Sequence, residues 1–344
     1  MDMHHRLMRQ TIDIAVRKAM VDIQKDAKRS IRNLVDLGLF FSRSENQKWF
    51  FSTAKKIVSN PCNPYNRLIS RLLAEVEHET VKTVGINLGY SSLTYGSGKL
   101  KKMHMETGVP LPWIILFDAL EACGDFLRFM EAFIGQGSEM GIYCYILRSF
   151  GKEDITALCN IAKHFGECTF ILDTEPEEIT EQNAGAINAV HNMLVYVRSQ
   201  RGELEEERCV NAFEILRKSR CFYGFLTGCN DGNISRVTAP EYIQSAILHG
   251  NRFGVYVADE DASEACKEEL YSFVCSERSE EGQPLVTFDW FSDIRHISSR
   301  ILSGGGCLAI HAAEKVYCDY MKLREPLEFS LIDIIERHMP CLDL

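Results

Sequence analysis

The sequence predicts an α/β fold, a partial (β/α)6 TIM-like parallel barrel with a helical N-terminal region and a small C-terminal hairpin extension. Six short apolar runs between residues 113 and 259 each have the length of a buried strand, and most are rich in β-branched or aromatic residues. Their starts lie roughly 24 to 31 residues apart, the size of one βα unit with its crossover. Amphipathic stretches separate them, so we expect parallel strands with helices outside.

The region 1–110 is predicted to be helical. Apolar residues recur three or four apart from Ile12 to Leu34, which predicts one long amphipathic helix. Such a stripe suits a membrane surface or a partner, but acidic residues dilute its basic face, and we expect it to dock on its own domain. Pro61 and Pro64 then break the chain before another helix.

The predicted barrel occupies residues 111–283, and its strands are the six apolar runs. They are WIILFD (113–118), GIYCYILR (141–148), CTFILD (168–173), NMLVYVR (192–198), CFYGFLTG (221–228) and RFGVYVAD (252–259). Between them, segments such as KEDITALCNIAKHF and NAFEILRK have the periodicity of amphipathic helices. Six successive units of this kind predict a parallel sheet that is either wound open or curled towards a barrel.

In the C-terminal extension, residues 284–344, the regular alternation of strands and helices is predicted to end. We expect a further strand in PLVTFDWF (284–291) and a helix over 292–302. After a glycine-rich break, CLAI (307–310) and KVYC (315–318) are predicted to be the two arms of a hairpin. A short terminal helix is expected in LEFSLIDIIERH.

Composition and charge narrow the class of protein. The net charge of −10 argues against nucleic acid as a partner, because phosphate binding needs a broad cationic face. We find no apolar run long enough to cross a membrane and no secretory signal, so we expect a soluble, cytoplasmic protein. The thirteen cysteines are scattered without a C-x-x-C pair, which favours buried thiols in a reducing compartment over a disulfide framework.

Charged residues stand at the carboxyl ends of the predicted strands, where parallel α/β folds gather their working residues. Reading off those ends gives Asp118, Arg148, Asp173, Arg198, Asp259 and Asp289, with Glu175 and Arg201 close by. Both signs of charge would face one mouth, which suggests a polar pocket for a charged small molecule or a peptide. The alternative is that strand ends meet solvent, where any charge is welcome.

Other motifs in the sequence give weaker indications of function. The sequence has no GxGxxG, GxxxxGK[ST], HExxH or GxSxG pattern, so nucleotide-binding, zincin and hydrolase interpretations lose their support. The stretch from Gly85 to Gly96 is either an anion-binding loop or, as we prefer, a buried connector. Cys307, His311 and Cys318 share the predicted hairpin, but their spacing fits no standard zinc knuckle.

The order of these pieces resembles a radical S-adenosylmethionine (radical SAM) protein. The resemblance runs from about residue 40 to 338. It rests on a helical preface, PWIILFD followed by Ala122-Cys123, six βα units, TFDWFSD, and a glycine-rich turn into CLAIHAAEKVYC. It is similar to the group whose C-terminal extension is of the auxiliary-cluster, or SPASM-like, type.

This resemblance implies cofactor positions that the sequence does not match. In the family, three cysteines after the first strand hold a [4Fe–4S] cluster, whereas here Cys123 occupies the first place and no second or third cysteine follows nearby. The family's Gly-Gly-Glu, which holds the cofactor's amino group, is replaced by the segment from Arg148 to Glu153. The ribose-contacting region reads Arg198-Ser199-Gln200-Arg201. The departures predict that radical chemistry is lost and that no cofactor binds.

Three functional hypotheses follow. The first is a cluster-free binding or accessory protein that holds a peptide, a small molecule or a partner protein at the barrel mouth, lined by Asp118, Cys123, Arg148, Asp173, Arg198, Asp259 and Asp289. The second is a non-radical enzyme in which the four strand-end aspartates hold a divalent metal. The third is residual radical chemistry with S-adenosylmethionine and a [4Fe–4S] cluster on Cys123 and distant cysteines such as Cys144 or Cys229.

Overall fold

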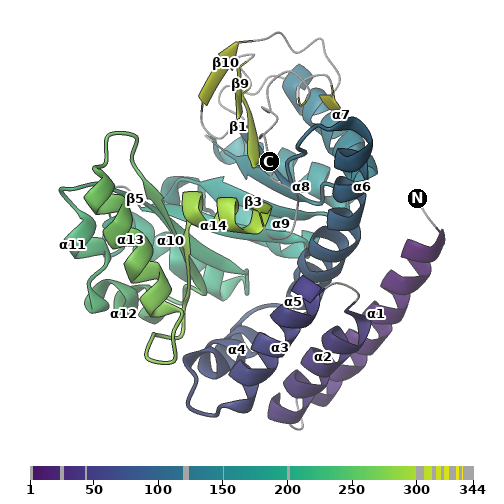
Figure 1. The fold of residues 1–344 in the computed structure, drawn as a ribbon. Helices are drawn as coiled ribbons and strands as arrows, with labels where there is room; N and C mark the ends of the chain where they lie inside the picture. The colour runs from purple at the N-terminus through teal and green to yellow at the C-terminus, as the bar shows by residue number, and fades with distance from the viewer. Residues whose placement is uncertain are drawn as a thin grey trace. The chain divides into compact units, whose positions relative to one another are not determined.

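The computed structural model forms two compact units, each made of two chain segments. The first unit contains Met1–Lys82 and Ser199–Trp290, and the second contains Thr83–Arg198 and Phe291–Leu344. The structure describes the chain except residues 1–2, 24–26, 43–44, 119–123, 150, 200–201, 300–305, 312–314, 319–320, 325–330, 333–334 and 336–344. Figure 1 shows the helices and strands of both units.

The N-terminal region is helical, as predicted, but the single long helix expected over 12–34 is wrong. Two helices cover it, α1 (Met3–Ile23) and α2 (Ala27–Phe41), followed by α3 (Glu45–Ser59). α1 packs against α2, and α2 against α3 (Figure 1). Folding back lets the apolar stripe of one helix cover that of the next, whereas one straight helix would leave its stripe uncovered.

Two shorter helices complete this region, α4 (Pro64–Glu75) and α5 (His78–Ile86). The predicted break at the prolines is confirmed, because Pro64 occupies the first turn of α4. Asn63 caps that helix through its side-chain oxygen, which accepts a hydrogen bond of 3.0 Å from the backbone N–H of Tyr65.

The first unit also holds three parallel strands in the order β5 (Tyr223–Cys229), β6 (Phe253–Ala258), β7 (Val286–Asp289). Its other helices are α10 (Glu207–Lys218), α11 (Ile234–Val237), α12 (Pro240–Leu248) and α13 (Glu264–Glu277). The helix predicted over 292–302 begins two residues early, as α14 (Trp290–Ile297) directly after β7, and all but its first residue belong to the second unit.

The second unit holds seven strands in the order β10-β9-β8-β1-β2-β3-β4. The five from β8 to β4 are parallel, while β9 and β10 run antiparallel to their neighbours. The strands are β1 (Ile114–Asp118), β2 (Cys144–Arg148), β3 (Thr169–Thr174), β4 (Met193–Ser199), β8 (Cys307–His311), β9 (Lys315–Cys318) and β10 (Met321–Arg324). The helices are η1 (Asn87–Gly96), α6 (Ser97–Thr107), α7 (Gly124–Met140), α8 (Lys152–His164), η2 (Pro176–Glu178) and α9 (Glu181–Val190).

The predicted fold class, α/β with the parallel strands of a TIM-like barrel, is confirmed. All six apolar runs are strands, and the C-terminal hairpin is present as β8 and β9. Two features were not predicted: β8 also pairs in parallel with β1, and β10 adds a third arm. Most of the predicted terminal helix lies outside the described residues.

Two further observations concern the cysteines and the hydropathy of the helices. The ten cysteines whose side chains the structure describes are thiols, and eight of them are buried. Among the described residues, no helix combines the length and the apolar character that a transmembrane span requires.

The stretch from Gly85 to Gly96 is buried in part, as we preferred, but it is not a loop. It is a helix of π type, η1, and its Asn87 side chain donates hydrogen bonds to the carbonyls of Gly166 (3.0 Å) and Cys168 (2.8 Å) just before β3. A Cβ on Gly96 would overlap the carbonyl oxygen of Gly141, so the two backbones approach closely here.

This close approach predicts that Gly96→Ala destabilises the protein. The added methyl group meets backbone that cannot move aside, and overpacking of this kind costs about 1–3 kcal/mol of unfolding free energy. Gly98→Ala is the matched control, because a Cβ there has no neighbour within 4 Å and alanine favours the helix. Urea unfolding should show a loss for Gly96→Ala only. Equal stabilities of the two variants would contradict the packing.

Candidate functional site

Three strand-end residues face one another because their strands are in register. Asp118 of β1 lies opposite Arg148 of β2, and Arg148 lies opposite Asp173 of β3. Side chains alternate between the two faces of a strand, so Tyr145, three residues before Arg148, points to the opposite face. There its hydroxyl donates a hydrogen bond of 3.2 Å to the carbonyl of Ile134 in α7. The charged row therefore occupies the face turned away from α7.

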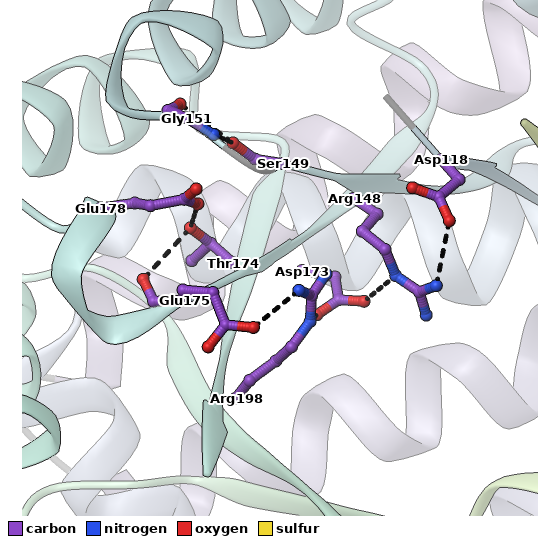
Figure 2. A network of polar contacts seen from close by, with 9 residues as sticks. All are labelled: Asp118, Arg148, Ser149, Gly151, Asp173, Thr174, Glu175, Glu178 and Arg198. Atoms are coloured by element: carbon purple, nitrogen blue, oxygen red, sulfur yellow. Dashed lines mark hydrogen bonds and ion pairs between the residues drawn. The ribbon is translucent and has the colours of Figure 1, made fainter. Parts of the chain in front are cut away.

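The charged side chains bond to each other in a continuous chain (Figure 2). Arg148 bridges two acids, with its Nη1 3.2 Å from Asp118 Oδ2 and its Nε 2.9 Å from Asp173 Oδ2. Arg198 of β4 does the same, with its Nε 2.7 Å from Asp173 Oδ1 and its Nη1 2.9 Å from Glu175 Oε1. We call these five residues the strand-end network. Asp173 is its centre, since each of its oxygens accepts from a different arginine.

The network is buried at its centre and more open at its margins. Asp118 and Asp173 are each 1% exposed, whereas Arg148 is 28%, Glu175 26% and Arg198 14% exposed. Burial opposes the charge of Arg198, but the ion pair and hydrogen bond with Asp173 outweigh it and raise the pKa of the guanidinium. Within these five residues, three carboxylates meet two guanidiniums.

A further acid beside the network was not predicted. Thr174, next to Asp173, donates a hydrogen bond of 2.5 Å to Glu178, whose side chain is 6% exposed (Figure 2). Glu178 lies in η2, and its backbone carbonyl accepts a 2.9 Å bond from Asn183. The run DTEPEE, which begins at the end of a strand, was the available signal. The short helix that turns Glu178 back towards the strand was not evident from it.

The predicted site residues are brought together only in part. Asp118, Arg148, Asp173 and Arg198 meet in the second unit, whereas Asp259 and Asp289 belong to the first. There Asp259 accepts a hydrogen bond of 2.8 Å from Asn230, and Asp289 lies opposite Tyr256 at the end of β7. Cys123 and Arg201 lie outside the described residues.

The described residues offer no metal or cluster site. No three histidine, cysteine or acidic side chains among them are grouped to hold a metal ion, and guanidiniums occupy the carboxylates of Asp118 and Asp173 instead. Cys307 and His311 stand four residues apart on one strand, about 13 Å at the usual rise, too far to share a zinc ion.

Two of the cysteines considered for residual radical chemistry, Cys144 and Cys229, are described, and a [4Fe–4S] cluster takes three or four thiolates. Cys144 is the first residue of β2, at the opposite end of the strand from Arg148, and burial raises the pKa of its thiol to about 12. Cys229 lies in the first unit, and burial raises its pKa further. A raised pKa disfavours the thiolate form, which is the form that binds a metal.

Comparisons with solved structures find chains with a similar fold. Streptococcus suis SuiB bound to precursor peptide SuiA is 8% identical, with a TM-score of 0.51 over 70% of this chain and 69% of that chain. SuiB bound to S-adenosylmethionine is 8% identical over 86% of this chain and 70% of that chain, with a TM-score of 0.49. Native anSMEcpe with bound AdoMet is 11% identical over 65% and 80%, with a TM-score of 0.45. No family model and no curated protein sequence matches.

The strand-end network predicts a large loss of stability for Asp173→Asn. The substitution keeps the shape but removes the charge that both arginines share, and breaking a buried pair from one side costs about 3–5 kcal/mol. Asp36→Asn is the matched control: its ion pair with Lys55 is also 2.7 Å long, but both partners are 52% exposed, and such pairs contribute at most about 1 kcal/mol. Urea unfolding at pH 7 measures both, and equal losses would contradict a stabilising role for the network.

Proposed function

We propose that this chain is a cluster-free, degenerate relative of the radical SAM enzymes, a pseudoenzyme that acts as a binding or accessory protein. Its ligand would be a peptide, a small molecule or a segment of a partner protein, held at the carboxyl ends of β1 to β4. The strand-end network is the observation that carries this proposal.

The resemblance would place a cofactor at the ends of the same strands, which supports the proposal. In the family, the residues after the second strand hold the amino group of S-adenosylmethionine, and those after the fourth strand contact its ribose. Arg148 and Arg198 end the corresponding strands here, and each is engaged by Asp173. Opening these pairs to admit a cofactor would leave buried charges without partners, which is costly. This supports a fold that is retained without its original chemistry.

The charges favour a basic ligand group. The three carboxylates of the network and Glu178 outnumber the two arginines, so an ammonium or guanidinium would restore the balance. Glu175 Oε2 is buried and has no hydrogen-bond partner among the described residues, which leaves an acceptor for such a donor. SuiB is seen with a precursor peptide, and a peptide with a lysine, an arginine or a free amino terminus would meet the same requirement here.

The C-terminal extension is part of the same proposal. We interpret residues 284–344 as a SPASM-like extension that has lost its auxiliary cluster. The antiparallel arms β8, β9 and β10 support it, because they follow a glycine-rich turn as the resemblance implies. In this interpretation, Cys307 is a buried thiol at the start of β8.

Iron and sulfide analysis tests the cluster-free state. After anaerobic purification and an attempted reconstitution, we expect no stoichiometric iron or labile sulfide and no absorption band near about 400 nm, because the three thiolates that a cluster needs are missing. S-adenosylmethionine should leave the melting temperature unchanged, since a ligand that binds only the folded state must raise it. About four irons per chain with a brown chromophore would overturn the proposal.

Peptide binding tests the basic-ligand requirement. A degenerate peptide library with a central lysine should raise the melting temperature more than the same library with that lysine acetylated. Glu175→Gln should weaken the affinity for the lysine library about tenfold, because one charge-assisted hydrogen bond contributes about that much, and the rise in melting temperature should shrink accordingly. Glu181→Gln removes a nearby exposed acid and should leave binding unchanged. Equal responses to the two libraries would argue against a cationic ligand.

A further inference from the structure

A second group of charges lies in the first unit, and its charges do not balance. Three arginines surround one carboxylate, that of Glu75 on α4. Arg252 Nη2 lies 2.7 Å and Arg217 Nε 3.3 Å from Glu75 Oε2, while Arg71 Nε is 4.0 Å from Oε1. We call these four residues the arginine cluster. It joins α4, the end of α10 and the residue before β6.

The cluster contains two buried N–H donors that have no hydrogen-bond acceptor among the described residues. Arg252 is only 2% exposed, yet its Nε has no hydrogen-bond partner among the described residues, and neither does the buried Nη1 of Arg71. Other donors of the same guanidiniums are used: Arg71 Nη2 donates to the carbonyl of Ile247 at 2.7 Å, and Arg252 Nη1 donates to that of Gly250. A buried donor that makes no hydrogen bond costs folding free energy. The two remaining N–H donors therefore favour binding of an acceptor.

No neighbouring group described supplies the missing negative charge. Burial raises the pKa of Tyr223 to about 12, so this phenol stays neutral, and its hydroxyl donates to the carbonyl of His249. The acids nearby have their own partners: Glu77 pairs with Arg220 at 3.6 Å, and Glu205 with His249 at 3.6 Å.

The titration of the cluster agrees with this excess of positive charge. Burial lowers the pKa of Arg71, and the like charges of Arg252 and Arg217 lower it further against the attraction of Glu75. Burial opposes ionisation of Glu75, but the hydrogen bond and charge of Arg252, with the charges of the other two arginines, outweigh it and lower its pKa. Glu75 is therefore ionised at neutral pH, and three cations against one anion leave two positive charges uncompensated.

We propose that Arg71, Arg217 and Arg252 form a binding site for a phosphate group, with Glu75 offsetting one of their three charges. Guanidinium donors form a planar fork that matches two oxygens of a phosphate. A phosphate group carries close to two negative charges at neutral pH, which equals the excess, whereas a carboxylate supplies one. Arg217 is 52% exposed and Glu75 26%, so the cluster reaches solvent from which such a ligand would arrive. The site is independent of the strand-end network and of the function proposed for it.

Calorimetric titration of the full chain with inorganic phosphate, at constant ionic strength set with sodium chloride, tests the site. We expect saturable binding at one site per chain. Arg217→Gln should weaken it about tenfold or more, since it removes one charge-assisted contact from an exposed residue that the fold tolerates. Arg236→Gln is the matched control, because Arg236 is also 52% exposed in the same unit and pairs with Glu203 at 3.9 Å. Its phosphate affinity should be unchanged.

Glu75→Gln separates a binding site from a purely structural cluster. Removing the one acid raises the excess charge, so phosphate should bind more tightly while the ligand-free protein melts earlier. A simple phosphate monoester in place of inorganic phosphate shows whether the site takes an esterified or a free group. Its affinity should fall as the pH drops through about 6, where the monoester loses its second charge.

Two results would overturn the proposal. The first is no saturable binding of either phosphate or the monoester. The second is binding that Arg217→Gln leaves unchanged, or that added chloride reproduces at the same concentration, which would indicate general screening of the arginines. In either case the cluster would only fasten α4 to the strands of its unit.

Discussion

The two ion pairs of Asp173 constrain how the neighbouring strands of the second unit align. Asp173 is a nearly fully buried carboxylate whose two oxygens accept from Arg148 on one neighbouring strand and Arg198 on the other. A slip of β3 by one residue would bring Thr174 or Leu172 opposite Arg148 and turn Asp173 towards the helices, where its charge would be unpaired. Apolar packing alone would not distinguish these registers so sharply, because both faces of β3 are buried.

The same constraint bears on function. In parallel α/β folds, the residues at the carboxyl ends of the strands supply the chemistry, while the apolar residues behind them specify the fold. Here the strand ends bind one another, through pairs that alternate in charge from Asp118 to Arg198. An end face of this kind rigidifies the site at the expense of open coordination positions. This arrangement is the basis of the proposed binding of a preformed ligand.

The fold was predictable because its signals are local. Each apolar run from 113–118 to 252–259 has a strand's length and composition regardless of its neighbours, and the spacing alone requires crossover connections. The pairing of β8 with β1 was not predictable, because it joins segments nearly 200 residues apart and no local pattern specifies which strand lies beside which. The helix predicted over 12–34 failed for a related reason: one periodic stripe is equally consistent with two helices packed on each other.

The site was predictable as a set of positions but not as a set of bonds. The sequence places Asp118, Arg148, Asp173 and Arg198 at strand ends, yet only the register decides which acid meets which arginine. Asp259 and Asp289 satisfy the same sequence rule and lie in the other unit. The strand-end rule could not find the arginine cluster, because Arg71 and Glu75 lie on one helix and Arg217 lies at the end of another.

The two charge groups use one device with opposite results. In each, a carboxylate bridges guanidiniums from separate elements: Asp173 joins two arginines, and Glu75 contacts three. The strand-end network contains two more acids, so the formal charges of its five residues sum to a negative value. The arginine cluster contains no further acid, so the formal charges of its four residues sum to a positive value. A buried group with excess charge lowers its free energy by taking up the opposite charge, so the sign of the excess determines the kind of ligand. Under the two proposals, one chain with a net charge of −10 would present a site for a cation and a separate site for an anion.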